Sequence, residues 1–203
     1  MTAYIRPLSI GDLSQCVAVE SAAFPPAEAA TPEKIEYRLS VCPELCYGLF
    51  VAAGTSDHDC IGQTEIPVLA SAPANSSDDK LLAHVISTKS TSSVVKDADM
   101  AFPPKWKDNP AGHYDVGHQP QGSTIALHSL AVTPSVQRRG LGKKLMASYT
   151  KHMKDAGIAD RIAILTYDRL LSYYQSLGFT HYGKSASEYA GVAWHDLAYE
   201  FSA

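Results

Sequence analysis

The sequence has no long apolar run, and its hydrophobic stretches are far shorter than the roughly 20 residues that a membrane-spanning helix needs. The first residues, Met1–Arg6, lack the apolar segment of a secretory signal, so a cytoplasmic location is expected. Positive charge is also scarce, with 17 Lys and Arg against 21 Asp and Glu. A general nucleic-acid-binding protein usually carries a strongly basic face, so the composition disfavours that class.

Cysteine is rare, and its four positions, Cys16, Cys42, Cys46 and Cys60, form no metal-binding pattern. No CxxC pair occurs, and Cys42 and Cys46 have no histidine nearby in the sequence. We therefore expect no metal site and reduced, partly buried thiols. The remaining composition, 45% hydrophobic and 19% charged, is typical of a globular chain that folds without disulfides.

Residues 1–203 are expected to form a single domain with two long loop insertions, at about 55–79 and 89–122. The first segment is rich in Ser, Asp, Ala, Pro and Gly, and the second contains several prolines. Loops of this length are uncommon in compact domains and often have a functional role, with decoration of the surface as the alternative. His113 and His118 lie in the second loop and are expected to be exposed.

Outside these loops strands alternate with helices, which predicts an α/β protein whose sheet is partly parallel at its centre. Strands are predicted over residues 4–7, 47–53, 81–88, 123–132, 162–166, 179–182 and 193–201. Helices are predicted over residues 12–23, 32–42, 142–156 and 170–177. Thr31 is the expected N-cap of the second helix, because its hydroxyl can accept a backbone hydrogen bond there.

The segment Leu127–Gly142 carries the clearest chemical signal. A strand ends, a short turn follows, and Gly140 and Gly142 stand where a helix begins. Glycine lets backbone N–H groups approach an anion, and the helix N-terminus adds partial positive charge. Full charges come from Arg138, Arg139, Lys143 and Lys144. The segment is a candidate pyrophosphate site. The alternative is a structural turn with solvated lysines. The spacing of the glycines fits neither a Walker loop nor a dinucleotide-binding turn.

The hexapeptide Gln137-Arg138-Arg139-Gly140-Leu141-Gly142 resembles the Q/R-x-x-G-x-G/A signature of the Gcn5-related N-acetyltransferase (GNAT) superfamily. The preceding strand segment Leu130-Ala131-Val132 and the later segment Tyr173–Phe179 are similar to the same family. The resemblance covers most of the chain outside the two long loops. It implies an α/β (α+β) GNAT fold, a central mixed twisted sheet of about seven strands with helices on both faces, and acetyl-CoA as cosubstrate.

Two segments, Leu127–Val132 and Cys42-Pro43-Glu44-Leu45, look like the serotonin (arylalkylamine) N-acetyltransferase branch, in which a fungal member such as the polyamine acetyltransferase of yeast would be similar. This implies transfer of an acetyl group, by direct attack, to the primary amine of serotonin, tryptamine or phenylethylamine. The alternatives are a polyamine or diamine acceptor, or a CoA-binding protein without catalysis. The expected partner is a small-molecule amine, with no nucleic acid or membrane, and the chain is expected to be a monomer.

The resemblance also assigns roles to individual residues. Tyr174 matches the tyrosine that protonates the departing CoA thiolate, and His128 matches a histidine that helps to deprotonate the amine. The plainer alternative for both is packing in the core. Acetyl-CoA binding is assigned to Leu130, Ala131, Val132, Gln137, Arg138, Arg139, Gly140, Leu141, Gly142 and Lys143.

The acceptor pocket is implied in the same way. Pro32, Leu165 and Trp194 fall where the family places walls of that pocket. Aromatic side chains at Phe24 and Tyr182 are further candidates for enclosing an aromatic amine.

One position departs from the family pattern. The family places a second histidine two residues before the first, and here that position is Ala126. Residues two apart on a strand share a face, so one member of a water-linked pair of bases is missing. His84, on another predicted strand, is a candidate to replace it across the sheet.

Overall fold

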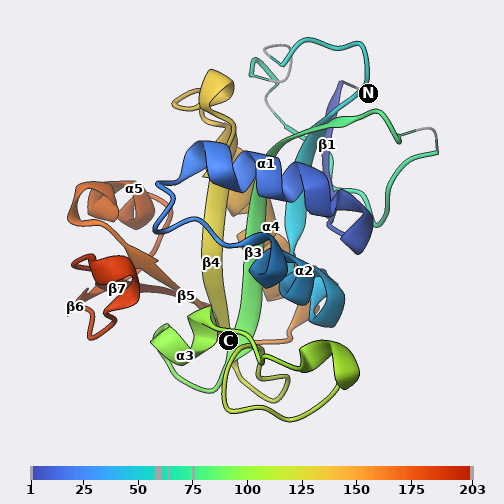
Figure 1. Cartoon of the computed structure of the whole chain (residues 1–203). Helices are drawn as coiled ribbons and strands as arrows, with labels where there is room; N and C mark the ends of the chain where they lie inside the picture. Colours follow the sequence, from blue (N-terminus) through green and yellow to red (C-terminus); the bar gives the residue numbers. More distant parts are fainter. Residues whose placement is uncertain (1, 58–60, 64, 75, 202–203) are drawn as a thin grey trace. The chain divides into compact units, whose positions relative to one another are not determined.

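The computed structural model describes residues 2–57, 61–63, 65–74 and 76–201 of the chain (Figure 1). Its helices are α1 Leu13–Ala23, α2 Pro32–Val41, α3 Asp97–Met100, α4 Leu141–Ala156 and α5 Leu171–Gln175. Its strands are β1 Ala3–Pro7, β2 Tyr47–Val51, β3 Lys80–Ser90, β4 Thr124–Val132, β5 Arg161–Thr166, β6 Thr180–Lys184 and β7 His195–Glu200.

The strands form a seven-stranded sheet in the order β1-β2-β3-β4-β5-β7-β6. β4 and β5 pair in parallel, whereas β1 with β2, β2 with β3, β5 with β7 and β7 with β6 pair antiparallel. The prediction of an α/β fold with a mixed, partly parallel sheet is therefore confirmed.

The predicted elements are present, and they differ from the prediction at their ends. β3 continues to Ser90, because the backbone of Lys89 is paired with Gln119 of the following segment. The helix predicted over 170–177 is shorter, since the chain turns at Gly178, whose φ of +93° only glycine adopts readily.

The chain divides into two compact units. Unit 1 comprises Met1–Ile86 and Ser129–Tyr149, and unit 2 comprises Ser87–His128 and Thr150–Ala203. Strands β3 and β4 and helix α4 contribute residues to both units. The expectation that residues 1–203 form a single domain stays a prediction.

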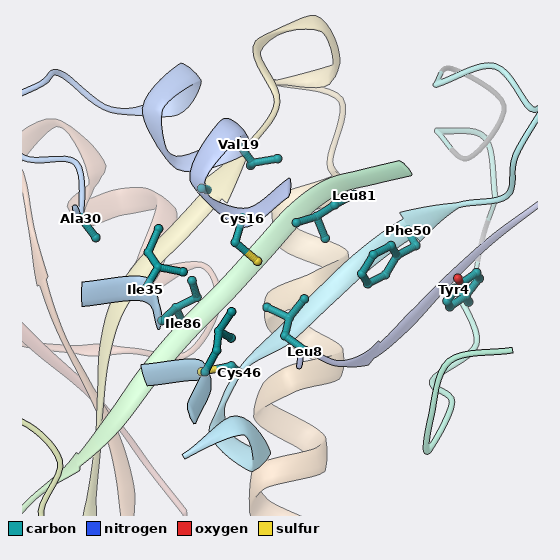
Figure 2. Packing of buried hydrophobic residues seen from close by; sticks show 12 residues of the cluster. Tyr4, Leu8, Cys16, Val19, Ala30, Ile35, Cys46, Phe50, Leu81 and Ile86 are labelled. Atoms are coloured by element: carbon teal, nitrogen blue, oxygen red, sulfur yellow. The ribbon is translucent and has the colours of Figure 1, made fainter. Parts of the chain in front are cut away.

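In unit 1, helices α1 and α2 cover one face of the strands (Figure 1). They meet the strands in a buried apolar cluster (Figure 2) that contains Tyr4, Leu8, Cys16, Val19, Ala30, Ile35, Leu39, Cys46, Phe50, Leu81, Ile86 and Ala131. α2 begins as predicted, because the Thr31 hydroxyl accepts a hydrogen bond from the Lys34 N–H at 3.3 Å. α1 ends before Phe24, which two prolines follow.

Helix α4 lies on the opposite face of the unit 1 strands (Figure 1). Its Tyr149 hydroxyl donates a hydrogen bond to the Leu45 carbonyl oxygen at 3.0 Å, and its ring meets the Tyr47 ring edge-on at 5.8 Å. Unit 1 therefore has helices on both faces of its strands, as the family resemblance implied.

Unit 2 is built around β5, which pairs with β4 on one side and β7 on the other. A second apolar cluster in this unit contains Val95, Met100, Ala126, Ala163 and Ala198, with Leu165 and Tyr189 partly buried against it. Small alanines on three neighbouring strands leave room for the larger Met100, which comes from the segment after β3. This segment therefore packs on the sheet.

The 89–122 segment is more ordered than a plain loop. It contains the short helix α3, and its ends are closed by a hydrogen bond from the Gln119 N–H to the Lys89 carbonyl oxygen at 2.9 Å. The Lys89 N–H in turn donates to His118 Nδ1 at 3.0 Å. The prediction that His118 is exposed is wrong, because this contact half-buries the ring, whereas His113 is exposed as predicted. Burial, followed by the charge of Lys89, lowers the pKa of His118 to about 4.

The 55–79 segment has little regular structure in the residues described, as predicted. It is paired with β1, where the Ile5 N–H donates to the Pro67 carbonyl oxygen at 2.8 Å and the Leu69 N–H donates to the Ile5 carbonyl oxygen at 2.7 Å. Cys60 lies outside the described residues. Cys16, Cys42 and Cys46 form no disulfide bond among the described residues, and all three are fully buried.

Candidate functional site

The ring of His128, half-buried on β4, is held by two side chains of unit 2. Nε2 lies 2.8 Å from Thr88 Oγ1, and Nδ1 lies 3.0 Å from Met100 Sδ. A thioether sulfur can only accept a hydrogen bond, so the neutral ring carries its proton on Nδ1. Nε2 then accepts the hydrogen bond of the Thr88 hydroxyl and is the basic nitrogen of the ring. The arrangement fixes both the tautomer and the orientation of His128.

Ala126 lies on the same β4 face as His128 and is fully buried. It packs with Val95 and Met100, both of which come from the 89–122 segment. The place where the family has a second histidine is therefore filled by apolar side chains of that segment. Neither Thr88 nor Met100 was identified from the sequence, because no motif pairs these residues with His128.

His84 is hydrogen-bonded to two other side chains of unit 1. Its side chain is fully buried, and its Nε2 lies 2.9 Å from Glu20 Oε2 and 3.1 Å from Ser129 Oγ. A fully buried histidine whose Nε2 is already hydrogen-bonded to a carboxylate and a hydroxyl is shielded from an amine in solvent. The structure therefore disfavours the interpretation that His84 replaces the missing histidine.

Tyr174 lies on α5 and is buried, with an exposed fraction of 8%. Its ring meets Tyr173 and Phe179 edge-on, at 5.0 and 5.6 Å between ring centres. Burial, with a smaller contribution from Tyr173, raises the pKa of Tyr174 above its ordinary value. Among the described residues its hydroxyl has no hydrogen-bond partner. Tyr174 is therefore a phenol that stays protonated at neutral pH.

The acceptor-pocket candidates of unit 2 differ in their surroundings. Leu165 packs against the cluster that contains Met100 and Ala126. Trp194 is buried by its contact with the Tyr167 ring at 4.9 Å, and its Nε1–H donates to the Tyr189 carbonyl oxygen at 2.8 Å. Tyr182 is 49% exposed and donates to Glu200, so it does not enclose a pocket, contrary to expectation.

The two acceptor-pocket candidates of unit 1 flank the connection between α1 and α2. Phe24 follows the last residue of α1 and is partly buried against the apolar cluster of Figure 2. Pro32 is the first residue of α2 and is exposed.

The turn between β4 and α4 has a backbone conformation that suits an anion. Gln137–Gly140 are exposed, and the short helix η4, Pro134–Val136, leads into them. Arg138 and Gly140 adopt positive φ values of 57° and 84°. The 16-residue helix α4 begins directly afterwards, and its first N–H groups have no partner within the helix.

Side chains around the turn fix its shape. The Gln137 side-chain amide donates to the Val132 carbonyl oxygen at 2.9 Å, which ties the turn to the end of β4. Ala131 and Leu141 bury their side chains, so only their backbone is available to a ligand. Leu130 and Val132 are partly buried, and Lys143 is exposed on the first turn of α4.

One of the four cationic side chains around this turn, Lys144, binds the 55–79 segment. The Lys144 ammonium donates to the carbonyl oxygens of Ile61, at 3.1 Å, and Gln63. The 55–79 segment therefore binds the Lys144 ammonium, and the contribution of its charge to the anion site stays a prediction. Arg138, Arg139 and Lys143 remain exposed at the turn.

The described part of the chain contains no cluster of three or more His, Cys, Asp or Glu side chains arranged for a metal ion. None of its helices combines the length and apolar character needed to span a bilayer.

Residues 75–179, just over half of the chain, match the model of the Acetyltransferase (GNAT) family. The chain therefore belongs to this family. The matched segment contains β3, β4, α4 and α5, and thus both the turn at Gly140 and the tyrosine at position 174.

Similar curated proteins include the serotonin N-acetyltransferases of Mesocricetus auratus and Macaca mulatta. Each is 29% identical to this chain over 80 residues, a segment that spans 39% of this chain and 39% of the relative.

Solved structures of the same fold include the loading GNATL domain of CurA from Lyngbya majuscula, with a TM-score of 0.66, 13% identity and coverage of 99% of this chain and 98% of that domain. The GphF GNAT-like decarboxylase in complex with isobutyryl-CoA has a TM-score of 0.64 at 13% identity, with 98% and 99% of the two chains covered. At this identity the likeness shows the fold alone, and a fold does not define the reaction.

Proposed function

We propose that this chain transfers the acetyl group of acetyl-CoA to the primary amine of an arylalkylamine such as serotonin, tryptamine or phenylethylamine. The observation that carries the proposal is the half-buried ring of His128, whose Nε2 is kept as the basic nitrogen by Thr88 and Met100. Membership of the GNAT family and the partial match to serotonin N-acetyltransferases support the donor and the class of acceptor.

The turn before α4 supports acetyl-CoA as the donor. Its exposed backbone, the positive φ of Gly140 and the N-terminus of a long helix suit a diphosphate, and Arg138 and Lys143 add charge. A methyl group added to Gly140 would meet no atom within 4 Å, so this side of the turn is open to a ligand. Acetyl-CoA would supply the activated thioester carbonyl.

His128 has the first chemical role. An alkylammonium resembles lysine with a pKa near 10, so holding the amine neutral at pH 7 costs about 4 kcal/mol. The proton reaches Nε2 of His128 through the Thr88 hydroxyl, which donates its own proton to Nε2 and accepts the amine proton, directly or through water. After the reaction the proton returns to solvent by the reverse path. The neutral nitrogen then forms its bond to the thioester carbon, whose carbonyl is polarised by backbone N–H groups of the Leu130–Val132 segment.

Tyr174 has the second role. As the carbon–sulfur bond breaks, the phenol donates its proton to the departing thiolate and releases CoA as the thiol. The new amide nitrogen still carries one proton too many, and this proton restores the phenol. Because the pKa of Tyr174 is raised, the side chain is protonated when the reaction begins.

Replacement of Tyr174 by Phe tests this assignment. Because the hydroxyl has no partner among the described residues, Tyr174→Phe is expected to keep the fold and CoA affinity and to lose about 100-fold or more in kcat. The matched control is Tyr173→Phe, the neighbouring tyrosine of α5, which is expected to retain wild-type turnover. A wild-type protein that binds CoA but acetylates no amine would instead be a non-catalytic CoA-binding protein.

A diamine or polyamine is the second candidate acceptor, and one cavity of unit 2 favours it. The cavity has a volume of about 140 Å³ and is lined in part by Val95, Lys96, Asp97 and Asp196. Within the described part of the chain Asp196 Oδ1 is buried without a hydrogen-bond partner, and a second ammonium group would supply one. Val95 also contacts the cluster that holds Ala126 and Met100, so the cavity adjoins the surroundings of His128.

Asp196→Asn separates the two acceptors. If the acceptor is a diamine, this variant raises the KM for spermidine or putrescine at least tenfold and leaves tryptamine unaffected. Asp115→Asn, on the exposed part of the 89–122 segment, is the control. Equal kinetics of both variants with spermidine would exclude this role for the cavity.

A further inference from the structure

A buried polar cluster in unit 1 joins one helix to two strands. Glu20 of α1, His84 of β3 and Ser129 of β4 are each at most 2% exposed. Glu20 Oε2 lies 2.9 Å from His84 Nε2 and 2.5 Å from Ser129 Oγ, and these two lie 3.1 Å apart. We refer to these three residues as the Glu20 network.

The protonation of the network follows from its geometry. Burial raises the pKa of Glu20, but the hydrogen bond and charge of His84, and then the hydrogen bonds from Ser129 and the Ala30 N–H, bring it below its ordinary value. Glu20 is therefore a carboxylate that can only accept hydrogen bonds, so the Ser129 hydroxyl and the His84 Nε2–H both donate to it. His84 Nδ1 is buried without a partner among the described residues, so the ring depends on its Nε2 contacts.

The second oxygen of Glu20 extends the network to the connection between α1 and α2. Oε1 accepts a hydrogen bond from the Ala30 N–H at 2.9 Å, and Ala30 itself is buried in the apolar cluster (Figure 2). This connection begins at Phe24 and ends at Pro32, the two acceptor-pocket candidates of unit 1.

The same carboxylate thus holds two segments with different roles. Ser129 directly precedes Leu130, where the donor strand is proposed to polarise the thioester, and Ala30 belongs to the acceptor segment. We propose that Glu20, His84 and Ser129 are positioning residues that fix the donor strand of β4 and the α1–α2 connection in one arrangement for acetyl transfer. This inference rests on the proposed function.

The buried ion pair of Arg6 and Asp12 in unit 1 provides a control with a structural role only. Arg6 and Asp12 form two hydrogen bonds, at 2.7 and 2.9 Å, and both side chains are 8% exposed. This pair joins β1 to the short helix η1, Ile10–Asp12, and among the described residues it has no hydrogen bond to β4 or to the α1–α2 connection. Asp12→Asn should therefore lower the melting temperature without changing kcat or KM.

The kinetic test compares Ser129→Ala, Glu20→Gln and the double variant with Asp12→Asn. Ser129→Ala and Glu20→Gln are each expected to lower kcat/KM for tryptamine about tenfold, since small misplacements of reacting groups are costly. KM values for both acetyl-CoA and the amine should rise, and the double variant should be no worse than Glu20→Gln alone. Wild-type kinetics in Ser129→Ala, or additive losses in the double variant, would overturn the proposal.

A second measurement separates this proposal from the proposed function. Hydrogen exchange of the Ala30 amide should be at least tenfold faster in Ser129→Ala than in Asp12→Asn, because Glu20 loses one of its anchors. If the wild type acetylates no amine, the proposed function fails, and the exchange result together with the CoA affinity of Ser129→Ala decides the positioning role. Unchanged exchange and unchanged CoA affinity would then overturn it.

Discussion

At the scale of single residues, the function proposed for His128 depends on a partner as much as on the histidine. Thr88→Val keeps the size of the side chain but removes the hydroxyl that lies 2.8 Å from Nε2. We expect kcat to fall about tenfold with little change in the KM for acetyl-CoA, because the ring loses its fixed orientation. Steady-state kinetics in which both substrates are varied measures kcat and the KM for acetyl-CoA separately.

Thr150→Val is the control for Thr88→Val. Thr150 is another buried threonine of unit 2, it lies on α4, and it has no assigned role. Equal losses in the two variants would show that buried threonines matter only for packing and would contradict the role of Thr88.

The raised pKa of Tyr174 predicts how kcat depends on pH under alkaline conditions. Its folded pKa is raised by burial, so the phenol keeps its proton through neutral and mildly alkaline pH and loses it only above the ordinary value of about 10. The rate should therefore show no loss from ionisation of Tyr174 up to about pH 10. A kcat profile between pH 6 and 10.5 measures this, and a falling limb near pH 8 that is absent in Tyr174→Phe would contradict it.

At this scale the sequence indicates the types of residue in the candidate site but not the partners of their side chains. His128 and Tyr174 were found because short motifs surround them. Thr88 and His128 are 40 positions apart, and Glu20 and Ser129 are 109 apart. Such contacts depend on strand register and on the packing of α1, which no local pattern specifies.

At the scale of elements, the turn before α4 depends on Gly140. At a φ of +84° an alanine is strained by roughly 1–2 kcal/mol, although its methyl group would meet no neighbouring atom. Gly140→Ala should lower the free energy of unfolding by about 1 kcal/mol and weaken CoA binding about tenfold, because relief of the strain moves the N–H groups of the turn. Urea unfolding and calorimetric titration with CoA measure the two effects.

Gly54→Ala is the matched control for this turn. Gly54 has a φ of +76° and open space around it, so the strain is similar, but it lies outside the turn. Its CoA affinity should equal that of the wild type. Equal weakening of CoA binding in both variants would contradict an anion site at Gly140.

The sequence predicts the ends of helices correctly where several local signals indicate the same boundary. Thr31 and Pro32 marked the start of α2, and Phe24 with the prolines after it marked the end of α1. It failed in the 89–122 segment, where α3 is too short to show periodicity. The side chains of this segment are ordered by packing on Ala126 and by the closure of Lys89 on Gln119, both of which are long-range contacts.

At the scale of the whole molecule, His118 links stability to pH. Its folded pKa of about 4 lies below the unfolded value of about 6.5, so the unfolded state binds the proton more tightly. The corresponding stability is fully present above about pH 6.5 and is lost as the pH falls towards 4. Because the ring is partly solvated, the loss should reach only about 2–3 kcal/mol.

His118→Asn measures this contribution, since the Asn carbonyl can still accept the hydrogen bond of the Lys89 N–H without titrating. Urea unfolding at pH 7.5, 5.5 and 4.5 should show a smaller loss of stability for this variant than for the wild type. The exposed His113, replaced in the same way, should leave the pH dependence unchanged. An identical acid dependence of wild type and His118→Asn would contradict the account of the 89–122 segment.

The match of residues 75–179 shows the family, and the seven strands form the mixed sheet. The proposed acceptor is tested only by activity. The most direct test is the rate of CoA-thiol release from acetyl-CoA with tryptamine and with spermidine, measured on the wild-type chain. We expect a kcat/KM for tryptamine at least tenfold above that for spermidine. A preference for spermidine, or no thiol release with tryptamine while CoA still binds, would contradict arylalkylamine acetylation as the function.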